Sequence, residues 1–450
     1  MWDRGTAPDK QLTLPFAQQR GEAAVGTPGE RSPVGDVGLM ERVVERRNLL
    51  TALARVKANG GSPGVDGMTV EDLPGYLQQH WLARRAAWLS GSHRPSPVKR
   101  VEIPKPGGGV RKLGIPTVLD RFLQQALLQV LQPEWDPTFS DHSYGFRPGR
   151  SAHQAIARAQ QYLEEGYTWV VDLDLEKFFD HVNPDKLMSR VKGRVTDRRG
   201  QQLIDRYLKA GALTGDGLEA TVEGTPQGGP RSPLLANLLL DDLDKELERR
   251  GHRFVRYAED SNIYVKSLRA GQRVLASVTR FWERRLQLMV NAAKSAVDRP
   301  WRRTFLGFTF TRRRPNRRLV SAKALTALKQ EVRQRTCRTR GVPFRRVVQD
   351  LRQYLDGWYA YFRFAEGQSI FKEMDSWGRR RLRCYVWKQW GRHRYRELRR
   401  RGVSQDLAWN TCKSAHGPWR FSRSPALAIA LPGQHFDRLG VPRLHQRSRR

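Results

Sequence analysis

Apolar residues recur along this chain at two spacings, one typical of helices and one typical of strands. From Leu39 to Ala58 they recur at helical spacing, which predicts an amphipathic helix that Asn59-Gly60-Gly61 ends. Similar spacing predicts further helices over 76–89, 121–131 and 152–163. After about Pro315 the strand patterns fade, and helical segments rich in basic residues follow.

Alternating apolar and polar residues predict a strand over 98–103, and further strands are predicted over 110–115, 169–175, 254–258 and 262–265. A glycine-rich segment, 105–109, joins the first two into a predicted hairpin, and a tight turn joins the last two. This order of elements predicts an α+β body followed by a helical basic domain. Residues 1–38 lack lasting periodicity and predict a mobile tail.

Two acidic clusters lie at the ends of predicted strands. Asp172 and Asp174 lie near the end of the strand over 169–175, and Glu259 and Asp260 stand between the last two strands. Carboxylates at the ends of adjacent strands can meet and hold a hard cation such as Mg²⁺. Two such ions about 4 Å apart support in-line phosphoryl transfer. The alternative is that these acids are solvated turn residues.

The net charge of the chain indicates what kind of molecule it binds. The 450 residues include 81 Lys and Arg against 45 Asp and Glu, a net charge of +36, which calls for a polyanion. Nucleic acid is the first candidate and an anionic membrane surface the second. Hydrophobic residues make up 39%, enough for folded cores, but no apolar run is long enough to span a bilayer.

The N-terminus and the cysteines favour a cytoplasmic protein. Residues 1–20 lack the apolar core of a signal peptide. Cys337, Cys384 and Cys412 are odd in number for a disulfide framework and too far apart for a zinc pattern. We therefore expect a cytoplasmic, multi-domain protein that binds nucleic acid.

The densest basic stretch, residues 379–401, contains eleven Lys or Arg and the single acid Glu397, with Tyr and Trp interleaved. Arginine forks contact phosphates and aromatic rings stack on bases, so structured RNA is the expected ligand of this stretch. The alternative is a helix with a solvated basic face and an aromatic core face. The candidate RNA contacts are Arg379, Arg380, Arg381 and Arg383.

Five motifs stand in one order along the chain: Tyr144–Ser151, Val170–Asp180, Gly224–Pro230, Arg256–Asn262 and Phe305–Phe308. Their order resembles the successive motifs of the reverse transcriptases that bacterial group II introns encode. The loop 61–67 and the helix before it resemble the N-terminal extension of that family. Its maturase (thumb, or X) domain and its small C-terminal segment are resembled by 357–362, 377–383, 387–390 and 422–439. The resemblance spans about residues 40–440.

The resemblance implies an α+β right-hand polymerase fold. Fingers and palm would span 39–310, an α-helical thumb/maturase domain 311–412, and a short basic segment, a candidate for DNA binding, 413–450. No Cys- or His-rich pattern follows the maturase-like part, so the form without a C-terminal HNH endonuclease is expected. The implied activity is RNA-templated DNA synthesis from deoxynucleoside triphosphates in a bacterial cytoplasm. The same protein would bind structured intron RNA and assist splicing and mobility.

The resemblance also assigns roles to single residues. Mg²⁺ would be held by Asp174, the Leu175 carbonyl, Glu259 and Asp260. The nucleotide would contact Lys105, Arg111, Phe179 and Gln227, the ring of Phe179 excluding a 2′-hydroxyl. Template phosphates would contact Arg147 and Arg150, and Lys294 would lie near the leaving pyrophosphate as a candidate general acid. The alternatives are a core role for Phe179 and plain exposed charges for Lys105, Arg111 and Lys294.

Two residues depart from the family pattern. Glu259 stands where the family's Tyr-Ala-Asp-Asp motif has its first aspartate, and its extra methylene moves the carboxylate by roughly 1.5 Å. Mg²⁺ demands near-octahedral geometry, whereas Mn²⁺ is larger and also accepts oxygen ligands. Arg231 stands where an apolar residue is expected. Three functions fit the sequence: a polymerase with an adapted site, a weakened or inactive RNA-binding maturase, and a free-standing relative recruited to DNA repair or defence.

Overall fold

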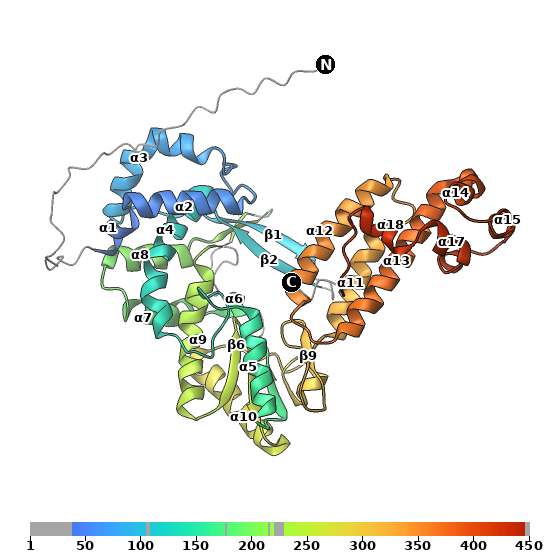
Figure 1. Cartoon of the computed structure of the whole chain (residues 1–450). Coiled ribbons are helices and arrows are strands. Elements are labelled where there is room, and N and C mark those ends of the chain that lie inside the picture. The colour runs from blue at the N-terminus through green and yellow to red at the C-terminus, as the bar shows by residue number, and fades with distance from the viewer. Residues whose placement is uncertain (1–37, 105–108, 176–177, 215–216, 220–228, 446–450) are drawn as a thin grey trace, which may run out of the picture. The chain divides into compact units, whose positions relative to one another are not determined.

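The computed structural model describes residues 38–104, 109–175, 178–214, 217–219 and 229–445 (Figure 1). The chain forms two compact units, one of residues 1–155 with 169–297 and the other of residues 156–168 with 298–450. The boundaries predicted at 38, 310 and 412 separate functional regions rather than compact units, and they stay a prediction. The predicted N-terminal tail lies outside the described residues. No described helix is both long and apolar enough to cross a membrane.

The first unit opens with helices that share one core. The segment predicted as a single helix forms two, α1 (Leu39–Val43) and α2 (Arg46–Asn59). At the break, the side-chain amide of Asn48 donates to the carbonyl of Val43 at 2.8 Å and so satisfies a helix-end acceptor. The other predicted helices are confirmed with shifted ends: α3 (Leu73–Leu89) and α4 (Val118–Trp135) belong to this unit, whereas most residues of α5 (Ala152–Glu164) belong to the second unit.

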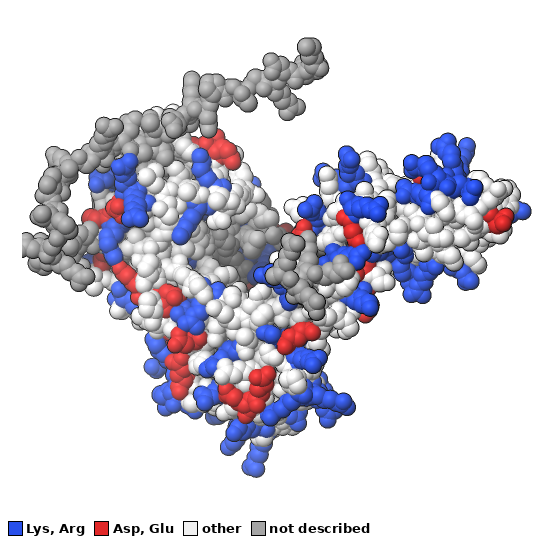
Figure 2. Space-filling model, in the orientation of Figure 1, with Lys and Arg blue, Asp and Glu red and all other residues white. Residues whose placement is uncertain are grey.

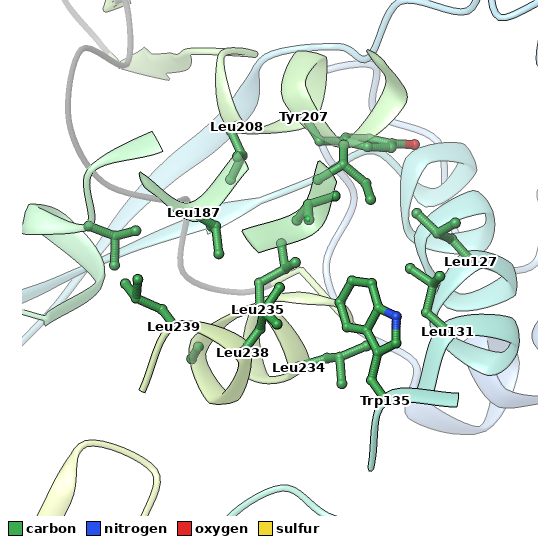
Figure 3. Close-up of a cluster of buried hydrophobic side chains, with 14 of the residues drawn as sticks. Leu127, Leu131, Trp135, Leu187, Tyr207, Leu208, Leu234, Leu235, Leu238 and Leu239 are labelled. Carbon is green, nitrogen blue, oxygen red and sulfur yellow. The ribbon is translucent and has the colours of Figure 1, made fainter. Parts of the chain in front are cut away.

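Helix α9 (Ser232–Arg249) supplies the centre of this core, because its buried leucines recur at helical spacing. They cluster with side chains of α4, α7 (Pro184–Lys192) and α8 (Arg198–Leu208) (Figure 3). Full burial of one such side chain contributes about 1.5–3 kcal/mol. The leucine face therefore fixes the position of α9. The clustered residues are Leu127, Leu131, Trp135, Leu187, Tyr207, Leu208, Leu234, Leu235, Leu238 and Leu239.

The predicted glycine hairpin is confirmed. Strands β1 (Val98–Pro104) and β2 (Val110–Ile115) pair antiparallel, with Val101 opposite Leu113. Two short strands, β4 (Ala212–Thr214) and β5 (Gly217–Glu219), extend this sheet in the order β2-β1-β4-β5.

A second sheet joins the strands that carry the acidic clusters. Strand β3 (Trp169–Leu173) pairs antiparallel with β7 (Asp260–Val265), placing Leu173 opposite Ser261. On the other side of β7 lies β6 (Arg253–Tyr257), with Tyr257 opposite Asp260, and β8 (Ala296–Asp298) completes the order β6-β7-β3-β8. Because β3 ends where β7 begins, the two acidic clusters lie at the same end of the sheet.

The second unit is mostly helical, as predicted. After a two-stranded sheet of β9 (Phe308–Phe310) and β10 (Arg318–Val320) come three long helices, α11 (Ala322–Arg335), α12 (Phe344–Phe362) and α13 (Gln368–Trp390). Five short helices follow: α14 (Arg394–Arg400), α15 (Gln405–Lys413), α16 (Pro418–Phe421), α17 (Pro425–Ala430) and α18 (Gly433–Arg438). On α13, Tyr385 and Trp387 are buried, so these two aromatic residues belong to the core, as the alternative interpretation of the basic stretch expected.

Candidate active site

The three predicted metal-binding carboxylates lie at one end of the β6-β7-β3-β8 sheet. Asp174 directly follows β3, Asp260 is the first residue of β7, and Glu259 lies in the turn between β6 and β7. Their charges interact with one another and with Asp172. The register of the sheet, rather than closeness in sequence, brings the two acidic clusters together.

Asp260 has the most perturbed electrostatics of this group. Burial, reinforced by the charges of Glu259, Asp174 and Asp172, raises the pKa of Asp260 from 3.8 to about 7, although Lys294 opposes the shift. Desolvation and like charges both disfavour the ionised carboxylate. A bound cation would offset this repulsion, and such a perturbed group is typical of a functional site.

The carboxylate of Asp174 is positioned through its own backbone. Its N–H donates to Ser295 Oγ at 3.1 Å, and its carbonyl accepts from the N–H of Asn291 at 2.9 Å. Its Oδ2 is buried and accepts no hydrogen bond from the described residues, while Lys294 Nζ forms an ion pair with it at 3.1 Å. The side chain of Lys294 is 67% exposed yet contacts the site, so it is more than a solvated charge.

These oxygen atoms fit a divalent cation. Mg²⁺ usually binds one or two carboxylates and takes its other ligands from water and substrate phosphates. Asp174 offers a buried carboxylate oxygen that is paired with the ammonium of Lys294, and Leu175 beside it is buried and forms a single bridge with Val290. In the part of the chain that is described, no three His, Cys, Asp or Glu side chains could hold a metal ion on their own. Water and substrate phosphates would supply the remaining ligands.

A buried ion pair fixes the turn that carries Glu259. The side chains of Arg256 and Asp244 are fully buried, and Arg256 Nε donates to Asp244 Oδ1 at 2.8 Å. From the same guanidinium, Nη1 donates to Asn237 Oδ1 and to the carbonyl of Ala258, both at 2.9 Å. Asp244 and Asn237 belong to α9. The leucine core therefore fixes the two side chains that bind Arg256 and, through it, the turn that carries Glu259. We find no sign of this pair in the sequence beyond an arginine in a strand.

The segment 140–150 packs against the same turn from another side. The N–H of Tyr144 donates to the carbonyl of Arg256 at 2.9 Å, and Asn237 Nδ2 donates to the carbonyl of Gly145 at 2.9 Å. A Cβ on Gly145 would overlap the backbone nitrogen of Ala258, so only glycine fits there. Ala258 itself has a φ of +56°, a left-handed conformation that is uncommon for alanine. The backbone on both sides of Glu259 is therefore tightly constrained.

The predicted nucleotide contacts are only partly visible. Lys105 and Gln227 lie outside the described residues. Arg111 is exposed on β2, opposite Ile103. Phe179 lies in the short helix α6 (Phe178–His181), half-buried against the core with its ring 5.0 Å from that of Phe178. Phe179 thus has core contacts and an exposed part, which leaves both interpretations of this residue open.

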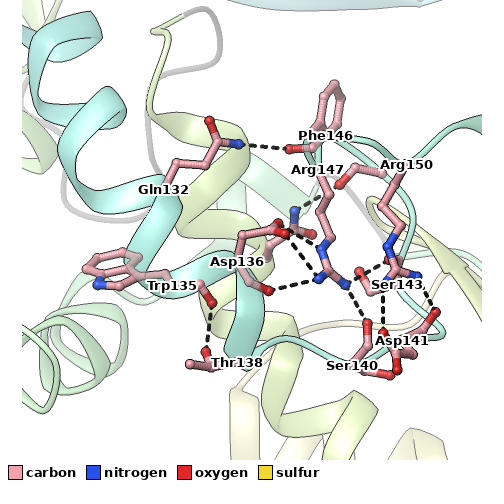
Figure 4. Close-up of polar contacts among 12 residues, drawn as sticks. Gln132, Trp135, Asp136, Thr138, Ser140, Asp141, Ser143, Phe146, Arg147 and Arg150 are labelled. Atoms are coloured by element: carbon pink, nitrogen blue, oxygen red, sulfur yellow. Dashed lines mark hydrogen bonds and ion pairs between the residues drawn. The ribbon is translucent and has the colours of Figure 1, made fainter. Parts of the chain in front are cut away.

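The contacts of Arg147 contradict the prediction that this residue binds a template phosphate. Its five N–H donors are all used within the protein: Nε and Nη2 bind the Asp136 carboxylate, Nη2 also binds the Asp136 carbonyl, and Nη1 binds the carbonyls of Ser140 and Ser143 (Figure 4). The side chain is only 3% exposed. Arg147 therefore holds its loop together and has no donor left for a template phosphate. Arg150, by contrast, is 26% exposed and pairs with the exposed carboxylate of Asp141.

The arginines predicted to bind RNA are also engaged inside the protein. Arg379 forms ion pairs with Asp375 and Asp437, and Arg380 lies over the ring of Trp419 at 3.9 Å. Arg381 donates to the hydroxyl and carbonyl of Thr336, and Arg383 to the carbonyls of Leu431 and Ser422. Burial lowers the pKa of Arg380, Arg381 and Arg383. These side chains attach α13 to its neighbours and do not form the open basic face that the sequence predicts.

Exposed arginines of the same basic stretch lie further along the chain. Arg392, Arg396 and Arg399 are exposed in and just before α14. Figure 2 shows Lys and Arg gathered over this end of the second unit. The basic stretch of the sequence thus divides into a structural half on α13 and a solvent-facing half around α14.

Arg231 is buried at the start of α9. Its guanidinium lies over the ring of Tyr207 at 4.5 Å, and Nη1 donates to the carbonyl of Ile204 at 3.3 Å. Burial lowers its pKa to about 10, although Tyr207 and Asp120 favour its charged form. An aromatic face and a nearby carboxylate compensate a cation where the sequence comparison expects an apolar side chain.

Comparison with known families agrees with these features. Residues 103–310 match the family model described as reverse transcriptase (RNA-dependent DNA polymerase), and residues 325–402 match the group II intron, maturase-specific domain. Both acidic clusters lie inside the first match, and α12, α13 and α14 lie inside the second.

The chain is also similar to parts of several known proteins. The chain is 38% identical to Protein YkfC of Escherichia coli over 46% of this chain and 57% of that protein. It is 40% identical to the group II intron-encoded protein LtrA of Lactococcus lactis over 34% of this chain and 26% of LtrA. The matches thus span little more than half of one relative and about a quarter of the other. A chain of the solved partial Cas6-RT-Cas1–Cas2 complex is 27% identical over 55% of this chain and 43% of that chain, at a TM-score of 0.36.

Proposed function

We propose, from its membership of the group II intron-encoded reverse transcriptase and maturase family, that this chain is an RNA-directed DNA polymerase that also binds structured intron RNA. The observation that carries the proposal is the meeting of Asp174, Glu259 and Asp260 at one end of the β6-β7-β3-β8 sheet. A divalent cation there would neutralise charge on the phosphates of a deoxynucleoside triphosphate. Asp174, Glu259, Asp260 and the Leu175 carbonyl are its proposed ligands.

In this reaction a primer 3′-hydroxyl attacks the α-phosphorus. Its O–H bond breaks with the proton passing to solvent, the new P–O bond forms, and the bond to pyrophosphate breaks. The proximity of Lys294 to the proposed metal site supports a role for it in this reaction, because its ammonium lies 3.1 Å from Asp174 Oδ2 and its side chain reaches solvent. We assign it the donation of a proton to the departing pyrophosphate. Phe179, Arg111, Lys105 and Gln227 keep their proposed roles at the nucleotide.

The RNA-binding part of the proposal rests on the exposed arginines around α14. Each phosphate contact contributes about one unit to the slope of log K against log salt. Replacing Arg392, Arg396 and Arg399 by glutamine should lower that slope for structured RNA. The matched control replaces three exposed arginines of α10 (Leu268–Phe281) and removes the same charge: Arg269, Arg273 and Arg280. Equal losses of slope in both variants would show only a general effect of charge.

Primer extension tests the catalytic part. Wild type should extend a DNA primer on an RNA template, and Asp174→Ala should abolish extension while leaving RNA affinity nearly intact, because metal and phosphate-backbone contacts use different residues. Asp141→Ala is the control, since Asp141 is an exposed acid of the same unit. Extension by Asp174→Ala at the wild-type rate would refute the site.

A second candidate function is a non-catalytic maturase. Glu259 favours it, because a longer side chain stands on a constrained turn where the family has aspartate. It predicts salt-sensitive RNA binding and no primer extension with any divalent metal. The presence of Asp174, Phe179 and Asp260 together favours the polymerase.

A further inference from the structure

An exposed aromatic ring lies beside the turn that carries Glu259. Phe146 is 53% exposed, although it belongs to a loop whose neighbouring residues are well packed. Its φ is +58°, a left-handed conformation that is strained for a bulky residue. An exposed apolar ring on a strained backbone is an outlier from which a functional role can be inferred.

The loop around Phe146 is rigidly held, so the position of the ring is defined. Arg147, the next residue, uses all five of its donors on Asp136, Ser140 and Ser143. Gly145, the residue before, packs against the backbone of Ala258. Figure 4 shows the ring of Phe146 pointing away from the hydrogen bonds around Arg147. The hydrogen bonds of Arg147 therefore fix the position of the Phe146 ring, which stays exposed to solvent.

The ring of Phe146 lies near that of Tyr257, with centroids 6.3 Å apart and planes tilted by 43°. Tyr257 is the last residue of β6 and lies opposite Asp260 in the strand ladder. Phe146 and Tyr257 therefore form an aromatic pair next to the turn that carries Glu259.

We propose that Phe146 is a stacking subsite for a nucleobase of the template–primer at the edge of the catalytic centre. The proposal rests on the proposed function, which supplies the polynucleotide. A base is the occupant that fits: it has a π-face for the ring, and its phosphates suit a chain of net charge +36. Holding the loop rigid beforehand lowers the cost of ordering it when nucleic acid binds.

The test measures binding without chemistry, using the full-length protein in EDTA. The probe is an RNA template annealed to a DNA primer, with 2-aminopurine as the template base at the primer terminus. Wild type should quench the fluorescence of this base through stacking. Phe146→Ala should lose most of the quenching and bind about 10-fold more weakly, equivalent to about 1.4 kcal/mol, whereas Phe146→Trp should retain both.

Two further variants separate stacking from plain apolar contact. Phe146→Leu keeps apolar bulk but has no π-face, so its quenching should fall with that of Phe146→Ala. Leu82→Ala is the matched control, because Leu82 is 81% exposed in the same unit on α3. Quenching by Phe146→Leu equal to that of wild type, or affinity of Phe146→Ala within twofold of wild type, would overturn the proposal. Because no catalysis is needed, wild type that quenches but never extends a primer would refute the polymerase and leave the stacking subsite standing.

Discussion

Neutralising Asp260 should make the metal-free protein more stable. A rise in pKa from 3.8 to about 7 means that the folded state disfavours the ionised carboxylate. At about 1.4 kcal/mol per pKa unit, the shift corresponds to a cost on the order of 4 kcal/mol above pH 7. Asp260→Asn removes the charge and keeps the shape. The gain should be nearly full at pH 8 and should vanish as the pH falls towards 3.8, where both folded and unfolded states carry the proton.

Thermal denaturation in EDTA measures this effect. At pH 8 the melting temperature of Asp260→Asn should exceed that of wild type by several degrees, since 1 kcal/mol corresponds to about 2–4 °C in a unit of this size. At pH 4 the two should coincide. Mg²⁺ or Mn²⁺ should raise the melting temperature of wild type and leave that of the variant nearly unchanged, because the cation offsets a repulsion that the variant lacks.

Asp141→Asn is the control of opposite sign. Arg150 holds the pKa of Asp141 below its usual value through a hydrogen bond, so neutralising Asp141 should leave stability unchanged or lower it. If Asp260→Asn lowers the melting temperature at pH 8 without metal, the carboxylates at the end of the sheet are not crowded, and the electrostatic basis of the metal site is wrong.

Two further predictions concern arginines that the sequence alone misjudges or passes over. Arg256→Met should lower the free energy of unfolding by about 3–5 kcal/mol in urea denaturation, because it leaves the buried carboxylate of Asp244 unpaired; an unchanged midpoint would show that the pair is not buried. Arg147→Gln and Arg379→Gln should also lower stability but leave the salt dependence of RNA binding unchanged. A clear fall in the salt slope of either would return that residue to the RNA-binding surface.

Local pattern was enough to predict the strands that carry the acids. The strands predicted over 169–175 and 262–265 have acids at or next to their ends, and the antiparallel pairing of β3 with β7 brings those ends together. The helix predicted over 39–58 is broken at Val44 because Asn48 offers a side-chain cap, a local contact that periodicity does not show.

The roles of the arginines could not be predicted in the same way, because charge along a sequence does not show burial. Arg147 and Arg150 share one motif, yet Arg147 faces three carbonyls and the Asp136 carboxylate, while Arg150 lies at the surface. Arg379 lies in the densest basic stretch and is nearly buried between Asp375 and Asp437. The partners that decide the role come from the folded loop around Arg147 and, for Arg379, from Asp375 one turn earlier on α13 and the distant Asp437.

The most direct test of the account is single-nucleotide incorporation on an RNA template, with Mg²⁺ and Mn²⁺ titrated in turn against wild type and Glu259→Asp. Arg256 and Gly145 constrain the turn, so we expect that its backbone does not shift to accommodate glutamate. Wild type should therefore incorporate nucleotide faster with Mn²⁺ than with Mg²⁺, and Glu259→Asp should raise the Mg²⁺-supported rate, each tenfold step being worth about 1.4 kcal/mol. No incorporation by either protein with either metal would contradict the polymerase.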